Sequence, residues 1–186
     1  GDPSSIVWMY HSHADEVGDT NAGLVGAIVV SRSGVQNPPT KDFVLFHSVL
    51  DEGKSTLKYK NLEKLPNWAN SWSGNADLIY KLRKDDAFKT SNKMHSVNGK
   101  LYCQLSGLDW AATDSVRLHF MSLGDEMAHA PALEGHTFLD HGIRRSALGL
   151  MAASMVSVDV SAHDVASQAP RSQPGKWLLY DSASDH

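Results

Sequence analysis

Short β-like segments separated by turn residues constrain the fold of this chain more than any other feature. Residues 114–124, DSVRLHFMSLG, alternate apolar and polar side chains, which predicts a strand with Val116 and Leu118 on one face and Arg117 and His119 on the other. Further segments rich in β-branched or aromatic residues lie at 4–10, 22–30, 41–51, 136–142, 155–161 and 175–181. Many short strands with turns between them predict an all-β sandwich or barrel.

Two regions of the chain call for a more detailed prediction. Asn98-Gly99, in KMHSVNGKLY, is a strong hairpin signal and predicts a tight turn between two strands. We expect the second of these strands to bury Cys103, because a lone cysteine is usually a small apolar core residue. Residues 57–88 mix charges, aromatics and a proline, and we expect them to be helical or irregular.

Size and charge exclude several classes of protein. The 186 residues are enough for one large domain, or for one domain and part of another. A net charge of -4 without a Lys/Arg cluster argues against a nucleic-acid partner. The sequence holds no apolar run long enough to span a membrane, and its first residues, GDPSSIV, lack the features of a signal peptide. A single cysteine allows no internal disulfide.

A His-Ser-His triplet near the start of the chain suggests a metal site. In a strand, His11 and His13 point to the same face, and paired neutral imidazoles suit copper, zinc and iron. Ten histidines is a high count for a chain of this length and adds weight to this interpretation. The alternative is that two exposed histidines are close by chance. Further ligands could come from Asp15, Glu16, Glu134, His136 and His141.

Four stretches resemble the cupredoxin domains of the multicopper oxidases. The resemblance is strongest to the ferroxidases ceruloplasmin and hephaestin, and the A domains of clotting factors V and VIII share the same pattern. The stretches are MYHSHADEVGDTNAGLVGAIVV, SNKMHSVNGKLYCQLSGL, FMSLGDEMAHAPALEGHTFLDHG and GKWLLYDSASDH. The resemblance implies a cupredoxin-like Greek-key β-sandwich over 41–186. It also implies that 1–34 are the last strands of a preceding unit, or strands that complete this sandwich or a neighbouring one.

The copper motifs of that family are only partly retained here. His11 and His13 match the motif that contributes to the trinuclear cluster. In HAPALEGH, His129 matches a ligand of the type 1 copper, whereas Ala132 and Glu134 replace histidines of the cluster.

The last motif departs further from the family pattern. In YDSASDH, Tyr180 and Ser182 replace cluster histidines, Asp181 replaces the type 1 cysteine, and His186 matches the second type 1 histidine. The resemblance therefore implies that oxidase activity is lost. We expect a module that is not an enzyme and that binds a single copper or iron through His129, Asp181 and His186. This donor set also suits zinc, and the alternative is that no metal binds.

A weaker hypothesis is a retained iron site. His95 and Asp185 match iron ligands of the ferroxidases, but Thr90 stands where the family has a glutamate. Hard cations prefer more oxygen ligands than these residues offer. Ferroxidase activity, as part of a larger assembly, is therefore kept as a further candidate function, ranked after metal binding and after the scaffold function described next.

A different class of function is a non-catalytic scaffold. It would bind a partner protein or an apolar, pigment-like small ligand, with Trp68 and Trp72 of NWANSWSGN as candidate contacts. An incomplete sandwich leaves an open strand edge, so we expect a homo-oligomer or a partner chain that completes it. The family resemblance implies secretion to the extracellular space.

Overall fold

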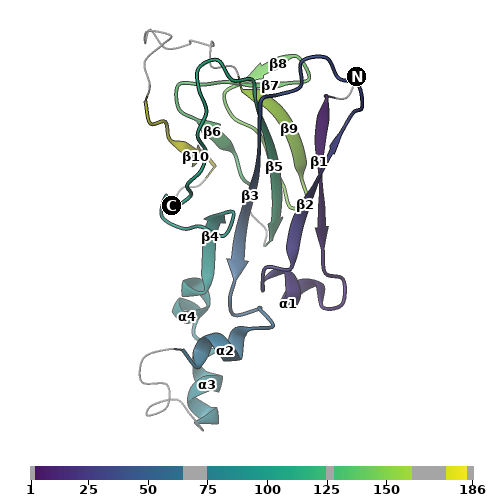
Figure 1. The fold of residues 1–186 in the computed structure, drawn as a ribbon. Helices are drawn as coiled ribbons and strands as arrows, with labels where there is room; N and C mark the ends of the chain where they lie inside the picture. Colours follow the sequence, from purple (N-terminus) through teal and green to yellow (C-terminus); the bar gives the residue numbers. More distant parts are fainter. Residues whose placement is uncertain (1–2, 65–74, 125–127, 161–174, 184–186) are drawn as a thin grey trace.

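The computed structural model describes residues 3–64, 75–124, 128–160 and 175–183. Strands dominate these residues, and the helices are few and short, as expected for an all-β chain (Figure 1). The elements are β1 Ser5–His11, α1 Glu16–Thr20, β2 Val25–Ser31, β3 Lys41–Asp51, α2 Lys58–Leu62, α3 Ala76–Leu82, α4 Asp86–Ser91, β4 Lys93–Val97, β5 Val116–Gly124, β6 Pro131–Leu133, β7 Phe138–Asp140, β8 Ile143–Arg145, β9 Met155–Val160 and β10 Leu179–Asp181.

Six strands form the main sheet, in the order β4-β3-β5-β9-β7-β8. Its centre is the parallel pair β3 and β5, in register from Lys41 opposite Val116 to Val49 opposite Gly124. The other neighbours in the sheet are antiparallel. The alternating pattern at 114–124 thus correctly predicts a strand, and that strand lies in the interior of the sheet.

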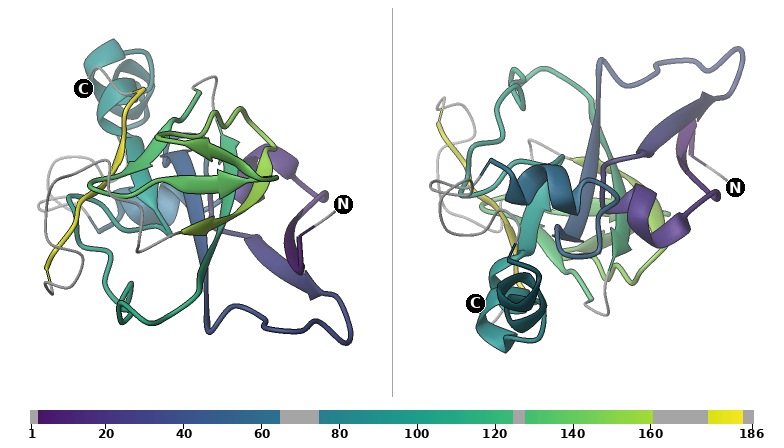
Figure 2. Two further views of the ribbon diagram at one scale, coloured as in Figure 1. Left: turned by 90° about the horizontal axis from the view of Figure 1, so that it is seen from above. Right: turned by 90° about the horizontal axis from the view of Figure 1, so that it is seen from below.

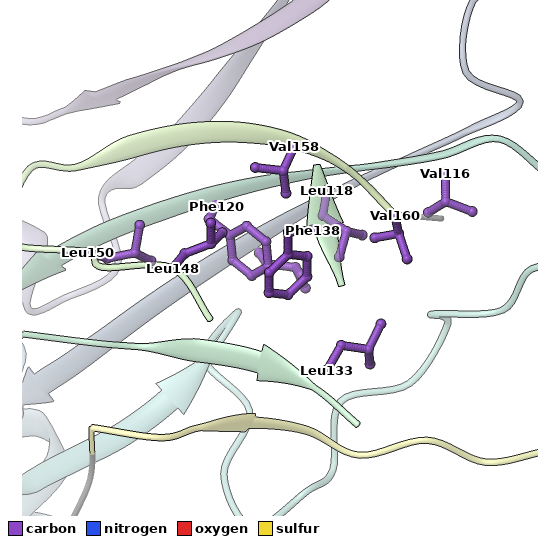
Figure 3. Packing of buried hydrophobic residues seen from close by; sticks show 10 residues of the cluster. Val116, Leu118, Phe120, Leu133, Phe138, Leu148, Leu150, Val158 and Val160 are labelled. Atoms are coloured by element: carbon purple, nitrogen blue, oxygen red, sulfur yellow. The ribbon is translucent and has the colours of Figure 1, made fainter. Parts of the chain in front are cut away.

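A second, smaller layer consists of β6 and β10, which pair antiparallel with Leu179 opposite Leu133. The apolar core contains residues of the main sheet together with Leu133 of β6 (Figure 3). Its buried members are Leu45, Val116, Leu118, Phe120, Leu133, Phe138, Leu148, Leu150, Val158 and Val160. Full burial of each large side chain contributes about 1.5–3 kcal/mol, so this cluster is the main source of stability for the sandwich.

The hairpin β1–β2 forms a separate two-stranded sheet, with Trp8 opposite Ile28. The two views of Figure 2 place this hairpin and β10 on opposite sides of the main sheet. Strand β1 packs against β9 and β5, so it covers the face of β5 that does not look into the core. The division of the chain at 34–41 remains a prediction.

Polar side chains join the hairpin to the main sheet. Arg117 is buried beneath β1, and its guanidinium makes two hydrogen bonds to Asp159, of 2.8 and 2.9 Å, and one to Ser5 Oγ of 3.1 Å. The sequence pattern places Arg117 and His119 on the polar face correctly, but both side chains are buried because β1 covers them.

His119 lies at the centre of a second polar group under the hairpin. Its ring nitrogens lie 2.8 Å from Ser157 Oγ and 3.0 Å from Asp42 Oδ1, and Ser157 Oγ also accepts a hydrogen bond from the backbone N–H of Val7. Burial lowers the pKa of His119, although Asp42 opposes this effect. The neutral imidazole therefore joins β3, β5 and β9, and Ser157 extends the contact to β1.

The region after β4 differs from the sequence prediction. Asn98 and Gly99 both have positive φ, of 52° and 70°, as a type I′ turn requires. Only Val97 and Lys100 pair across the turn, however, and residues 101–115 form no strand. Cys103 is exposed, so the prediction of a buried thiol was wrong. The physical reason is that Leu105, Leu108 and Trp110 pack onto the core from an irregular loop.

Helices α2, α3 and α4 lie between β3 and β4, at one end of the molecule (Figure 1). They confirm the expectation of helical or irregular structure for the described part of 57–88. Asp85 begins α4 as its N-cap, accepting a 2.8 Å hydrogen bond from the backbone N–H of Phe88. No helix among the described residues has the length and apolar character needed to cross a membrane.

Candidate metal centre

Three potential metal ligands meet between the two layers of the sandwich. They are His47 of β3, His129 just before β6, and Asp181 at the end of β10. One ligand atom from each lies within 4.8 Å of the others. The sequence prediction named His129 and Asp181 but missed His47.

Asp181 is held in place by the pairing of β10 with β6, which sets it opposite Pro131. Its Oδ1 accepts hydrogen bonds from the backbone N–H groups of Ala130, at 2.7 Å, and Ala183, at 3.1 Å. Burial opposes the charge on Asp181, but these hydrogen bonds and that from His129 outweigh it and lower its pKa. The side chain is therefore a carboxylate, the form that binds a metal ion.

His129 is fixed by both its backbone and its ring. Its N–H and C=O exchange two 2.8 Å hydrogen bonds with Leu150, which ties this residue to the strand-like segment before β9. Its Nδ1 lies 2.6 Å from Asp181 Oδ2, a charge-assisted distance. The imidazole and the carboxylate are thus in direct contact before any ion binds.

His47 lies on the core face of β3, the same face as Leu45 and Val49. Its ring centre is 5.8 Å from those of His129 and Phe120. Burial, aided by the neighbouring His129, lowers the pKa of His47 to about 4, so the imidazole is neutral at physiological pH. The sequence does contain a signal for His47. In the predicted strand at 41–51, this histidine occupies a position where the alternation of side chains predicts an apolar core residue.

The donor set does not fit the blue copper site of the family. Such a site needs a thiolate, and Cys103 is exposed and outside the cluster, while Asp181 offers hard oxygen. Two imidazoles and one carboxylate do fit a single zinc, copper(II) or ferrous ion.

The His-Ser-His triplet forms a second group of potential ligands, in which His11 is half-buried and His13 and Glu16 are exposed. His11 and His13 have ring centres 4.9 Å apart, and Glu16 at the start of α1 completes a group whose donor atoms lie within 4.8 Å. His11 Nδ1 contacts the backbone oxygen of Ser12 at 3.0 Å, which leaves Nε2 for another partner. Among the additional ligands considered from the sequence, only Glu16 belongs to this group.

The remaining predicted site residues contribute less. His95 is exposed on β4 and belongs to no group of three potential ligands within the described ranges. Asp185, His186, Trp68 and Trp72 lie outside the described residues, so the predicted iron site, the second type 1 histidine and the tryptophan contact surface stay predictions.

Comparison with known proteins gives full-length sequence matches. Hephaestin of Homo sapiens is 35% identical over 194 residues, covering 100% of this chain and 15% of hephaestin. Ceruloplasmin of Homo sapiens is 31% identical over 191 residues, covering 100% of this chain and 16% of ceruloplasmin. The chain thus spans less than a fifth of the curated relatives it matches. No protein-family model matches it.

Solved structures share the fold. The blue copper oxidase from Nitrosomonas europaea superposes with a TM-score of 0.59 at 18% identity, covering 98% of this chain and 50% of that one. A second multicopper oxidase gives 0.58 at 13% identity, covering 95% of this chain and 51% of that one. These likenesses confirm the predicted all-β Greek-key sandwich. Together, the full-length sequence matches and the shared fold identify this chain as a ceruloplasmin/hephaestin-like cupredoxin domain.

Proposed function

We propose that this chain is a cupredoxin-like module that binds a single copper or iron ion and has no oxidase activity. The observation that carries the proposal is the pair of His129 and Asp181, 2.6 Å apart and largely buried. The resemblance to the family matches these two residues to its type 1 site. A carboxylate and an imidazole bind a mononuclear ion well, but without a thiolate they do not make an electron-transfer site of the blue copper type.

The absence of oxidase activity follows from the ligands that the chain lacks. Reduction of dioxygen in the family requires a trinuclear cluster with imidazoles from all four motifs. Ala132, Tyr180 and Ser182 offer no imidazole there, and of the cluster residues only His11 and His13 remain.

Elemental analysis of the purified chain tests metal binding. We expect about one copper or iron per chain, no intense blue absorption, and loss of the ion in His129→Ala. The matched control is His141→Ala, because His141 is exposed and its ring contacts only the neighbouring Asp140 among the interactions described. A wild-type chain that stays metal-free after exposure to these ions contradicts the proposal.

Oxygen consumption with ferrous iron tests the ferroxidase alternative. For the isolated chain, we expect ferrous iron to be oxidised no faster than free ferrous iron in solution. Robust turnover that depends on His129 would instead assign the chain a catalytic role, alone or within a larger assembly.

A scaffold function is the second candidate, and one observation favours it. The outer face of the hairpin exposes Trp8, Tyr10, Ile28 and Val30, each by about half of its surface. Exposed apolar patches of this kind mark contacts with another protein. The partner would be a second copy or another chain, and an apolar small ligand remains the alternative. The resemblance to ceruloplasmin and hephaestin supports a location outside the cell.

A further inference from the structure

We propose that His47 is a third protein ligand, and that His47, His129 and Asp181 together hold one divalent ion of the zinc or copper(II) type. This inference rests on the proposed function, because it assumes that His129 and Asp181 bind an ion. It adds a residue that the copper motifs in the sequence do not point to, and it predicts a site unlike the blue copper centre.

The first argument is an unsatisfied polar atom. His47 Nε2 is the only buried side-chain nitrogen or oxygen without a hydrogen-bond partner in the described part of the chain. Leaving such an atom unpaired costs about 1–3 kcal/mol. Its position on the core face, beside Phe120, would accept an apolar side chain without that cost. A bound ion would supply the missing partner.

The second argument is the position of the donors. A tetrahedral ion with bonds of about 2.0–2.2 Å places its ligands about 3.4 Å apart, so donors within 4.8 Å need only small side-chain movements. The backbone N–H groups of Ala130 and Ala183 hold Oδ1 of Asp181 and so orient the carboxylate.

The third argument concerns which ions fit. Calcium and magnesium require six or more oxygen ligands, and this site offers one carboxylate beside two imidazoles. Imidazole suits zinc and copper(II), and both accept a mixed nitrogen and oxygen set. The site therefore selects a transition ion over the hard cations.

Metal titration of His47→Phe tests the role of His47. We expect zinc affinity, measured by competition with a chromophoric chelator, to fall at least tenfold, whereas His141→Ala keeps the wild-type affinity. The metal-free His47→Phe variant should unfold at a higher temperature than the wild type, because the unpaired nitrogen is gone. A structural role alone would lower the unfolding temperature.

Electron paramagnetic resonance of the copper(II)-loaded protein gives a second readout that does not depend on the folding of that variant. We expect coupling to at least two imidazole nitrogens in the wild type, and at least two to remain in His186→Ala. A single nitrogen in His186→Ala would overturn the role of His47, as would unchanged zinc affinity in His47→Phe.

The outcomes separate the two proposals. Loss of binding in His129→Ala together with unchanged binding in His47→Phe rejects His47 as a ligand and leaves the proposed function intact. A wild-type chain that binds none of zinc, copper and iron rejects both.

Discussion

At residue 181, a carboxylate stands where the resemblance to multicopper oxidases places a cysteine thiolate. The change from soft sulfur to hard oxygen removes the bond that gives blue copper its colour and tunes its potential. The neighbouring imidazoles can still bind the metal ion, but they cannot replace the bond between copper and sulfur. The chemistry of the site therefore depends strongly on this one side chain.

Replacing the carboxylate by a thiolate should restore part of the family's spectrum. Asp181→Cys would bring a thiolate to His129 and His47, which together make a His₂Cys set. We expect the copper(II)-loaded variant to gain an intense visible absorption band that the wild type lacks. Asp181→Ser is the control, since it changes the donor without adding sulfur. A copper-bound but colourless Cys variant would show that these three residues do not converge on one ion.

At the scale of elements, β5 uses both of its faces. One face carries Leu118 and Phe120 into the core, and the other carries Arg117 and His119 against β1. The hairpin β1–β2 thus docks on the main sheet partly through buried polar groups, which favour one register and orientation over others. The attachment of the hairpin should accordingly be sensitive to single polar substitutions.

Removing the guanidinium of Arg117 should loosen the hairpin. In Arg117→Met, Asp159 and Ser5 lose their charged hydrogen-bond partner, and we expect a loss of about 2 kcal/mol in the free energy of unfolding. Denaturant titration measures this loss. Amide hydrogen exchange should rise more in β1 and β2 than in β3. Equal protection of β1 in the variant and the wild type would contradict this account of docking.

The lowered pKa of His119 predicts a pH dependence of stability. The unfolded chain takes up a proton near the ordinary histidine pKa of about 6.5, whereas the folded chain does so only at lower pH. The stabilisation is therefore complete above about pH 6.5 and is lost as the pH falls through the folded-state pKa. His119→Gln, which cannot titrate, should show a flatter decline in denaturant titrations between pH 7 and pH 5, in the presence of a chelator. Parallel pH profiles would refute this role.

At the scale of the whole molecule, the hairpin leaves an apolar surface toward solvent. Trp8 and Ile28 are paired across its strands, and Tyr10 lies over Gly26, where any side chain at residue 26 would collide with its ring. The opposite face of β1 packs on the main sheet, so the exposed face is free to contact another protein surface.

We expect the isolated chain to associate through this surface. Sedimentation velocity should show a species larger than the monomer in the wild type, and a monomer in the double variant Ile28→Lys, Val30→Glu. Val17→Lys is a matched control, because Val17 is similarly exposed but lies on α1. Association that persists in the double variant would place the contact elsewhere on the molecule.

The sequence by itself determined most of the strands, the sandwich and part of the candidate site. Alternation at 114–124 is a local signal that does not depend on neighbouring structure, and the resemblance to the copper motifs of multicopper oxidases pointed to His129 and Asp181. The sequence pattern could not show which residues on a polar face are covered by another part of the chain. Arg117 was predicted to be on the polar face, but its burial depends on β1, more than a hundred residues away.

Only the tertiary structure decided that His47 belongs with His129 and Asp181, and that Cys103 does not lie in the core. His47 is remote in sequence from both ligands, and only the fold brings β3 of the main sheet close to the separate β6–β10 pair, where His129 and Asp181 lie. Cys103 stays exposed, whereas the larger apolar residues that follow it pack on the core. In both cases the reason is long-range packing. It decides which side chains meet and which are buried, and no local sequence pattern encodes it.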